Sequence, residues 1–325
     1  MSLFLILVGA ALLMIGAHWL VQGASSLAVA MRISPLIIGL TVVAFGTSTP
    51  ELAVSVNSAL LDAPEIAIGN VVGSNIFNIL LILGCSALIT PLSVANRVIR
   101  IDIPLMIVAS LATWWICLDG NIGAIEGAAL LGSLLVYTFW LIRISRREGA
   151  SIALEAIVPT DAATPHWRRS SWFQCVLIVI GLGALTLGSK LLVSGAVAIA
   201  EALGVSPAVI GLTIIAAGTS LPEVATSLMA AWAGEKDIAV GNVIGSNLFN
   251  LLGVLGISAL VSRSGLPVAE SFLQFDLPVM VLVAVICLPI AVKTRQIGRL
   301  AGGLLLCGYI GYTLWLVFQA TSVAS

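Results

Sequence analysis

The chain has 325 residues, of which 60% are hydrophobic and only 9% are charged, and its formal net charge is −1. Soluble domains typically carry about 25% charged residues, so this composition excludes an ordinary soluble protein and favours a membrane protein. We therefore expect a lipid bilayer as the surroundings of the chain, and no nucleic-acid partner.

Apolar stretches long enough to cross about 30 Å of hydrocarbon recur along the whole sequence. The first lacks the basic N-terminal region of a signal peptide and has a counterpart in the second half, so we expect it to be a retained helix. The sequence predicts an all-α membrane protein with ten transmembrane helices, near residues 3–30, 36–61, 66–90, 101–118, 123–142, 172–199, 208–233, 238–261, 275–292 and 299–319.

Two segments of the chain, residues 35–84 and 207–256, are near copies of each other, with 27 identities in 50 ungapped positions. Each copy contains GTSxPE followed by GNxxGSNxxN, and each places a lone glutamate, Glu51 or Glu223, in the middle of a predicted span. An ionisable group inside a bilayer costs at least ~2.5 kcal/mol and occurs mainly on ion or substrate pathways. These two glutamates are therefore the first candidates for a functional site.

The residues around each glutamate offer mainly oxygen atoms. Pro50 and Pro222 interrupt the helix and are expected to free the carbonyl groups near Gly46 and Gly218, for which a desolvated cation is a suitable partner. Hydroxyl and amide oxygens come from Thr47, Ser48, Ser55, Ser74 and Asn78, and from their counterparts Thr219, Ser220, Ser227, Ser246 and Asn250. Hard cations, and Ca²⁺ in particular, prefer such an all-oxygen set.

Two plainer interpretations compete with an ion site. The small residues of the motifs could simply let helices pack closely, as they often do in membranes. The glutamates could instead form structural salt bridges, for which Lys190 is the only basic residue placed deep in a span. One lysine cannot easily neutralise two carboxylates, so we favour the ion site and expect Lys190 to be structural or to extend toward the interface.

The distribution of basic residues predicts the orientation. If the ten spans are real, one face of the membrane receives only Arg263, and the other receives Arg32, Arg97, Arg100, Arg143, Arg146, Arg147, Arg168, Arg169, Lys236, Lys293, Arg295 and Arg299. The basic face should be cytoplasmic, so both termini should lie outside the cytoplasm of a multi-pass protein of the cell (inner) membrane.

The same count predicts the domain organisation. Residues 1–143 form a first repeat of five helices, residues 144–171 form a short cytoplasmic linker, and residues 172–325 form a second repeat of five helices. Because five is odd, the second repeat enters the membrane in the opposite direction, and inverted repeats of this kind place their binding site near the midplane. The linker is too small to house a regulatory domain.

Taken together, the duplicated GTSxPE and GNxxGSNxxN elements resemble the alpha repeats of the calcium/cation antiporter superfamily, especially the bacterial and archaeal sodium/calcium exchangers. The resemblance implies that Glu51 and Glu223 hold calcium together with the backbone carbonyls of Thr47 and Thr219. It also implies flanking sodium sites completed by Ala44, Ser48, Ser74, Asn78, Ala216, Ser220, Ser246 and Asn250. Some relatives, including potassium-dependent exchangers, carry aspartate where this chain has Asn250, so we expect no potassium dependence.

We therefore expect a secondary antiporter that exchanges sodium for calcium by alternating access, with these ions as its transported partners and no cofactor. The nearest alternative is cation/proton exchange on the same residues, because two carboxylates in one low-dielectric site favour proton binding. An intramembrane enzyme is disfavoured, since the sequence has no HExxH, no GxSxG and no Cys/His pairing.

Overall fold

The computed structural model describes residues 1–61, 63–155, 170–205, 210, 214 and 216–323, and nearly all of them are helical. The first half contains α1 (Ser2–Met31), α2 (Pro35–Ile38), the π-helical η1 (Gly39–Val43), α3 (Ala44–Thr47), α4 (Thr49–Leu60), α5 (Pro64–Phe77), π-helical η2 (Asn78–Leu83), α6 (Gly84–Ile89), π-helical η3 (Val98–Asp102), α7 (Ile103–Ile116), the short 3-10 helix η4 (Cys117–Asp119) and α8 (Ala124–Glu155). The second half contains α9 (Ser171–Ala202), α11 (Ala216–Thr219), α12 (Leu221–Trp232), α13 (Lys236–Leu248), π-helical η7 (Phe249–Val254), α14 (Leu255–Val261), π-helical η8 (Phe272–Asp276), α15 (Leu277–Thr294) and α16 (Arg299–Val323).

Eight helices in the described part of the chain are long and apolar enough to cross a membrane, and they coincide with eight of the predicted spans. The predicted span at 36–61 is a helix pair, Pro35–Thr47 and Thr49–Leu60, with a 45° bend between its two parts. The predicted span at 208–233 is described only in part, through α11 and α12, because most of its first residues lie outside the described ranges. The chain is therefore a helical, multi-pass membrane protein.

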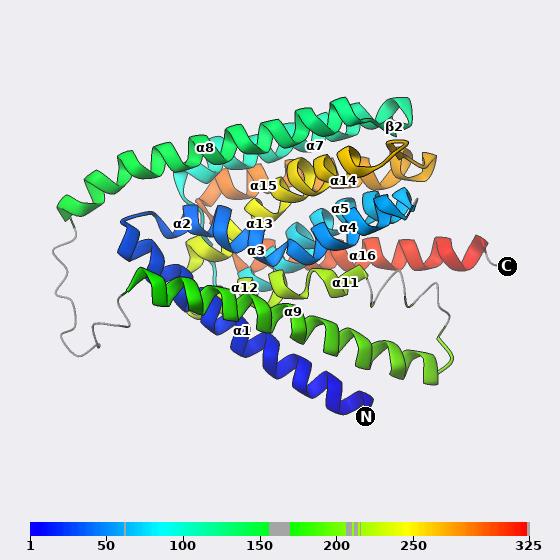
Figure 1. The fold of residues 1–325 in the computed structure, drawn as a ribbon, viewed down its shortest axis with the longest axis horizontal. Coiled ribbons are helices and arrows are strands. Elements are labelled where there is room, and N and C mark those ends of the chain that lie inside the picture. The colour runs from blue at the N-terminus through cyan, green and yellow to red at the C-terminus, as the bar shows by residue number, and fades with distance from the viewer. Residues whose placement is uncertain (62, 156–169, 206–209, 211–213, 215, 324–325) are drawn as a thin grey trace.

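Helices α1 and α9 pack against each other in antiparallel fashion along one side of the molecule, opposite α7 and α8 (Figure 1). Glycines spaced seven residues apart allow this close approach. A Cβ atom at Gly9 would lie 2.7 Å from the carbonyl oxygen of Gly188, and one at Gly16 would lie 2.8 Å from that of Gly181. Without side chains at these positions, the two backbones come into direct contact.

Two of the spans form the centre of the molecule. One is Pro64–Ile89, built from α5, η2 and α6, and the other is Lys236–Val261, built from α13, η7 and α14; both are largely buried. In α13 every residue from Ile238 to Leu248 is buried. Because these spans carry serines and asparagines, their polar groups must find partners inside the protein or bind a ligand there.

Two short antiparallel strand pairs join the two halves. Strand β1 (Leu92–Ser93) pairs with β4 (Gln296–Ile297), with Leu92 opposite Ile297. Strand β2 (Asn121–Ile122) pairs with β3 (Leu266–Pro267), with Ile122 opposite Leu266. In each pair one strand comes from each half, so the ends of spans far apart in sequence are held side by side.

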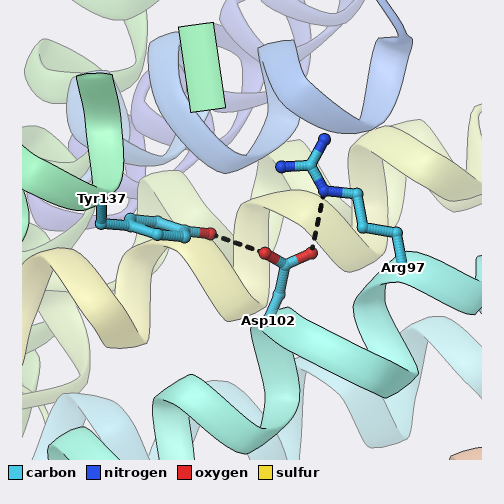
Figure 2. Close-up of polar contacts among 3 residues, drawn as sticks. All are labelled: Arg97, Asp102 and Tyr137. Carbon is cyan, nitrogen blue, oxygen red and sulfur yellow. Dashed lines mark hydrogen bonds and ion pairs between the residues drawn. The ribbon is translucent and has the colours of Figure 1, made fainter. Parts of the chain in front are cut away.

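A buried polar cluster holds α8 against the end of η3 (Figure 2). The Tyr137 hydroxyl donates a hydrogen bond of 2.9 Å to Oδ1 of Asp102, and Arg97 Nε lies 3.8 Å from Oδ2 of the same carboxylate. The second half has a matching contact, in which Tyr312 of α16 donates to Oδ1 of Asp276 at 2.8 Å. Both aspartates directly precede a helix with proline in its first turn. These contacts anchor α8 and α16, so both aspartates have structural partners.

The ends of the helices lie on two opposite faces. In Figure 1 the start of α1 and the end of α16 lie toward the right-hand side, whereas the end of α8 and the start of α9 lie on the left. Helix α8 runs to Glu155, so the first part of the predicted linker continues this helix, and residues 156–169 lie outside the described ranges. Large apolar side chains such as Phe4 and Leu300 are 66% and 81% exposed, which fits an outer surface in contact with lipid.

Candidate ion-binding site

Each predicted glutamate lies at the start of a half-helix inside the protein. The chain leaves helical geometry at Ser48, which has φ −82° and ψ 11°, between α3 and α4. Ser220 has φ −89° and ψ 6° between α11 and α12. Proline follows each break, as the sequence predicted, and Glu51 and Glu223 then occupy the first turn of α4 and α12. The positive end of a helix dipole and its free N–H groups favour a carboxylate at this position.

The hydrogen bonds of the two carboxylates cross between the repeated segments. The Ser220 hydroxyl donates to Oε1 of Glu51 at 2.8 Å, and the Ser48 hydroxyl donates to Oε1 of Glu223 at 2.7 Å. The Ser220 hydroxyl also lies 3.1 Å from that of Ser74. Both glutamates are only 1% exposed. The two copies of the motif therefore build one polar centre together.

Several buried oxygen atoms of the predicted site residues make no hydrogen bond within the described part of the chain. They are Oε2 of Glu51, Oε2 of Glu223, Oδ1 of Asn78, Oδ1 of Asn250 and Oγ of Ser246. Leaving a buried polar atom unpaired costs about 1–3 kcal/mol, and more for a charged group. All five belong to predicted site residues, and oxygen atoms of these kinds can coordinate a hard cation.

The structure also places the remaining predicted site residues. Ala44 and Ala216 begin α3 and α11. Thr47 and Thr219 end these short helices. Ser74 is buried in α5, one turn before Asn78.

A further pair of asparagines holds the helix breaks, and the sequence interpretation did not single them out. The Thr47 hydroxyl donates to Oδ1 of Asn242 at 3.1 Å, and the Thr219 hydroxyl donates to Oδ1 of Asn70 at 3.3 Å. Asn70 in turn donates to the backbone carbonyl of Glu51 at 3.1 Å. Both are the first asparagine of the duplicated GNxxGSNxxN element, so their repetition in the sequence could have identified them. The hydroxyl groups of both threonines therefore have hydrogen-bond partners within the protein.

The structure also places the Gly218 carbonyl and Lys190. The Gly218 carbonyl, expected to be free for a cation, accepts a hydrogen bond from the Ser189 hydroxyl of α9, so the protein itself satisfies it. Lys190, the candidate counter-charge for the glutamates, is exposed on α9. Within the described ranges neither Glu51 nor Glu223 forms an ion pair. Their charge is therefore not neutralised by a basic side chain there.

The described residues contain no cluster of three or more histidine, cysteine, aspartate or glutamate side chains suited to a metal ion. The centre instead combines two carboxylates with hydroxyl, amide and carbonyl oxygens. Such a set of oxygen atoms, with two formal negative charges, suits a hard cation.

Comparison with known proteins agrees with this picture. The chain is 30% identical to the sodium/calcium exchanger MaX1 of Methanosarcina acetivorans over 98% of this chain and 99% of that protein. It is 38% identical to the inner membrane protein YrbG of Escherichia coli, over 96% of this chain and 94% of the relative. Among solved structures, the sodium-calcium exchanger NCX_Mj, soaked without Na⁺ and Ca²⁺, superposes with a TM-score of 0.82 at 34% identity, covering 97% of this chain and 98% of that one.

A sequence model of the sodium/calcium exchanger protein family matches residues 1–143 and 173–318, which include both copies of the motif. The match spans both halves and leaves out little more than the predicted linker. With its helical membrane fold and its paired glutamate motifs, this chain belongs to the sodium/calcium exchanger family.

Proposed function

We propose that this protein is a secondary antiporter that exchanges Na⁺ for Ca²⁺ at one site shared by the two repeated segments. The observation that carries the proposal is the pair of buried glutamates. Each has one oxygen bonded to a serine of the other segment and one oxygen that no described residue hydrogen-bonds. In this proposal Glu51 and Glu223 hold calcium with the carbonyls of Thr47 and Thr219. The flanking sodium sites are completed by Ala44, Ser48, Ser74, Asn78, Ala216, Ser220, Ser246 and Asn250.

Coupling follows from the charge of the site. Two ionised carboxylates balance one Ca²⁺ or share several Na⁺, and both ion types compete for the same oxygens. Loading calcium and a full set of sodium ions together would leave excess positive charge in a low-dielectric centre, which is costly. The site therefore carries either calcium or sodium across the membrane in each step, never both. Movement of one ion in one direction is thereby coupled to movement of the other in the opposite direction.

Alternating access requires two equivalent routes to this site. We propose ten spans arranged as two inverted five-helix repeats, residues 1–143 and 172–325, with α1 and α9 as the sliding gates. The close glycine contacts between α1 and α9 and the crossed hydrogen bonds between Ser48, Ser220 and the two glutamates support a near-symmetric arrangement of the two halves. In the cell membrane the basic face, with the linker, is cytoplasmic, and both termini are outside the cytoplasm.

Calcium flux under two separate gradients tests the proposed coupling ion. Purified protein in liposomes should take up calcium when a sodium gradient is imposed and should not do so when only a pH gradient is imposed. A liposome without protein is the control for leak. Uptake driven by the pH gradient alone would instead support calcium/proton exchange on the same carboxylates. Uptake under neither gradient would contradict calcium antiport altogether.

A further inference from the structure

Two further asparagines, Asn75 of α5 and Asn247 of α13, lie beside the proposed ion ligands and are 2% and 1% exposed. Neither carries an unpartnered oxygen, so neither offers the site a free ligand. Asn250 Nδ2 donates to Oδ1 of Asn75 at 3.2 Å, and Asn78 Nδ2 donates to Oδ1 of Asn247 at 2.9 Å. Each proposed ligand amide is thus bonded to an asparagine from the other repeated segment.

The other end of each asparagine contacts groups that can only accept hydrogen bonds. Asn247 Nδ2 lies 3.4 Å from the sulfur of Met106 in α7. Asn75 Nδ2 lies 3.9 Å from the sulfur of Met280 in α15 and 3.4 Å from the backbone carbonyl oxygen of Asn247. A thioether sulfur and a carbonyl oxygen have no proton to donate. If either amide were reversed, its oxygen would face another acceptor.

These contacts fix the direction of the whole hydrogen-bond chain. Because Asn75 must turn its NH₂ group toward the acceptors, its oxygen faces Asn250, and Asn250 must in turn present its NH₂ group to Asn75. In the second chain, Asn247 turns its NH₂ group toward the Met106 sulfur, so its oxygen faces the NH₂ group of Asn78. The carbonyl oxygens of Asn78 and Asn250 are then left without a hydrogen bond, as the structure has them. An amide oriented in the opposite sense would present N–H groups to a cation and repel it.

We propose that Asn75 and Asn247 are positioning residues, which orient the side-chain amides of Asn250 and Asn78 so that their oxygens are available to sodium. This inference rests on the proposed function, because it presupposes that sodium binds at Asn78 and Asn250. It assigns a role to two residues that need not touch an ion themselves. The two methionine sulfurs set the direction of the chain from its outer ends.

A double-mutant experiment separates orientation from packing. We would measure the Na⁺ and Ca²⁺ concentrations that give half of the maximal thermal stabilisation of the full-length protein in detergent. Asn75→Ala should raise the half-saturating Na⁺ concentration about three- to tenfold, the size expected for one lost hydrogen bond. The Ca²⁺ value should change by less than about twofold, because calcium is assigned to the glutamates and threonine carbonyls.

The same substitution should lose its effect when orientation no longer matters. In an Asn250→Asp background both side-chain oxygens are acceptors, so Asn75→Ala should shift the Na⁺ value by less than about twofold. Asn247→Ala with Asn78→Asp provides the mirror test if Asn75→Ala does not fold. Ser258→Ala, which removes a buried hydroxyl from the same span as Asn250, is the packing control and should leave both ion responses unchanged.

The contradicting outcomes are distinct. In one, Asn75→Ala raises the half-saturating Na⁺ concentration equally with asparagine and with aspartate at position 250; in another, it raises the Na⁺ and Ca²⁺ values equally. Either result would mean that Asn75 serves packing, and would overturn the positioning role alone. An unaltered protein that responds to neither ion would overturn the proposed function and, with it, this inference.

Discussion

At the scale of single residues, the distinctive feature is that two buried carboxylates have no basic partner among the described residues. Each is placed in the first turn of a half-helix and accepts a hydrogen bond from a serine of the other repeated segment. The helix dipole and the serine hydroxyl offset part of the cost of burying the charge. The remaining negative charge is available to a cation, in contrast to Asp102, which lies beside Arg97.

The crossed serine bonds predict that the two serines matter equally. Ser48→Ala and Ser220→Ala should each raise the half-saturating Na⁺ concentration about tenfold, because each removes a site oxygen and a hydrogen bond to a charged group. Thr49→Ala is the control, since Thr49 is adjacent but exposed and bonds only to the Phe45 carbonyl in the described structure. Sodium titration of transport would reveal the shifts. A strong effect from one serine with none from the other would argue against a shared site.

Asn250 predicts transport without potassium. A neutral amide adds an oxygen but no charge, so the site has no third carboxylate to hold an additional cation. Sodium-driven calcium uptake should be the same in liposomes that contain potassium and in liposomes where choline replaces it. An absolute requirement for potassium would show that the role of Asn250 has been misassigned.

The sequence suggested the site residues because the repeat marks them twice, and the structure buries both glutamates in one polar centre. It could not predict the direction of the hydrogen bonds between the asparagine side chains, because that direction depends on Met106 and Met280 from other helices. Nor could it predict that Ser189 satisfies the Gly218 carbonyl, since this contact links α9 to α11 across 29 residues. Such contacts depend on the packing of helices, which local sequence does not specify.

At the scale of elements, broken helices and glycine contacts define how the site is built and how it could move. The breaks at Ser48 and Ser220 bring helix ends into the protein interior, where the backbone groups of a helix end can coordinate an ion. Outside this centre, α1 and α9 approach closely along their glycines. The long helices are thus in direct backbone contact, whereas the site itself is formed by short ones.

The glycine contacts predict a clear difference between two positions on α9. Gly188→Ala would place a Cβ atom 2.8 Å from the Gly9 carbonyl oxygen, so the helices must separate. Overpacking of this kind costs about 1–3 kcal/mol, and the apparent melting temperature in detergent should fall. Gly183→Ala is the matched control, because a Cβ atom there meets nothing within 4 Å. Equal melting temperatures for the two variants would contradict the close contact.

Hydropathy predicted eight spans well because each is a long apolar helix, and Pro50 correctly indicated the interruption of the bent pair. The strands β1 to β4 were not foreseen. Each has only two residues, and each is defined by a partner in the other half of the chain. Segments this short carry no periodic signal, so only the folded arrangement specifies them.

At the scale of the whole molecule, the two halves are joined at several places. Both strand pairs, the α1–α9 contact and the crossed serine–glutamate bonds each combine one element from each half. The end of α8 and the start of α9 lie on the face opposite the start of α1 and the end of α16 (Figure 1). The charge distribution predicts that the linker and the termini lie on opposite sides of the membrane.

The orientation predicts the result of chemical labelling. In a variant whose five natural cysteines are replaced by alanine, a single cysteine introduced in the linker, residues 144–171, should react with an impermeant reagent only after the cytoplasmic side is exposed. A cysteine placed at position 2, next to the N-terminus, is the control and should react from outside intact cells. Labelling of the linker in intact cells would reverse the proposed topology.

The most direct test of the central claim, that two glutamates form one exchange site, is sodium-driven calcium uptake by Glu51→Gln and Glu223→Gln variants in liposomes. Each substitution keeps the shape of the side chain but removes half of the formal charge of the site. Both variants should elute from size exclusion as the unaltered protein does, and Glu65→Gln, a change in the first turn of α5 away from the centre, should transport normally. We predict loss of uptake in both Glu51→Gln and Glu223→Gln, by about a hundredfold or more, because an uncompensated change of charge at a buried site costs several kcal/mol. Normal uptake by either variant would contradict the account.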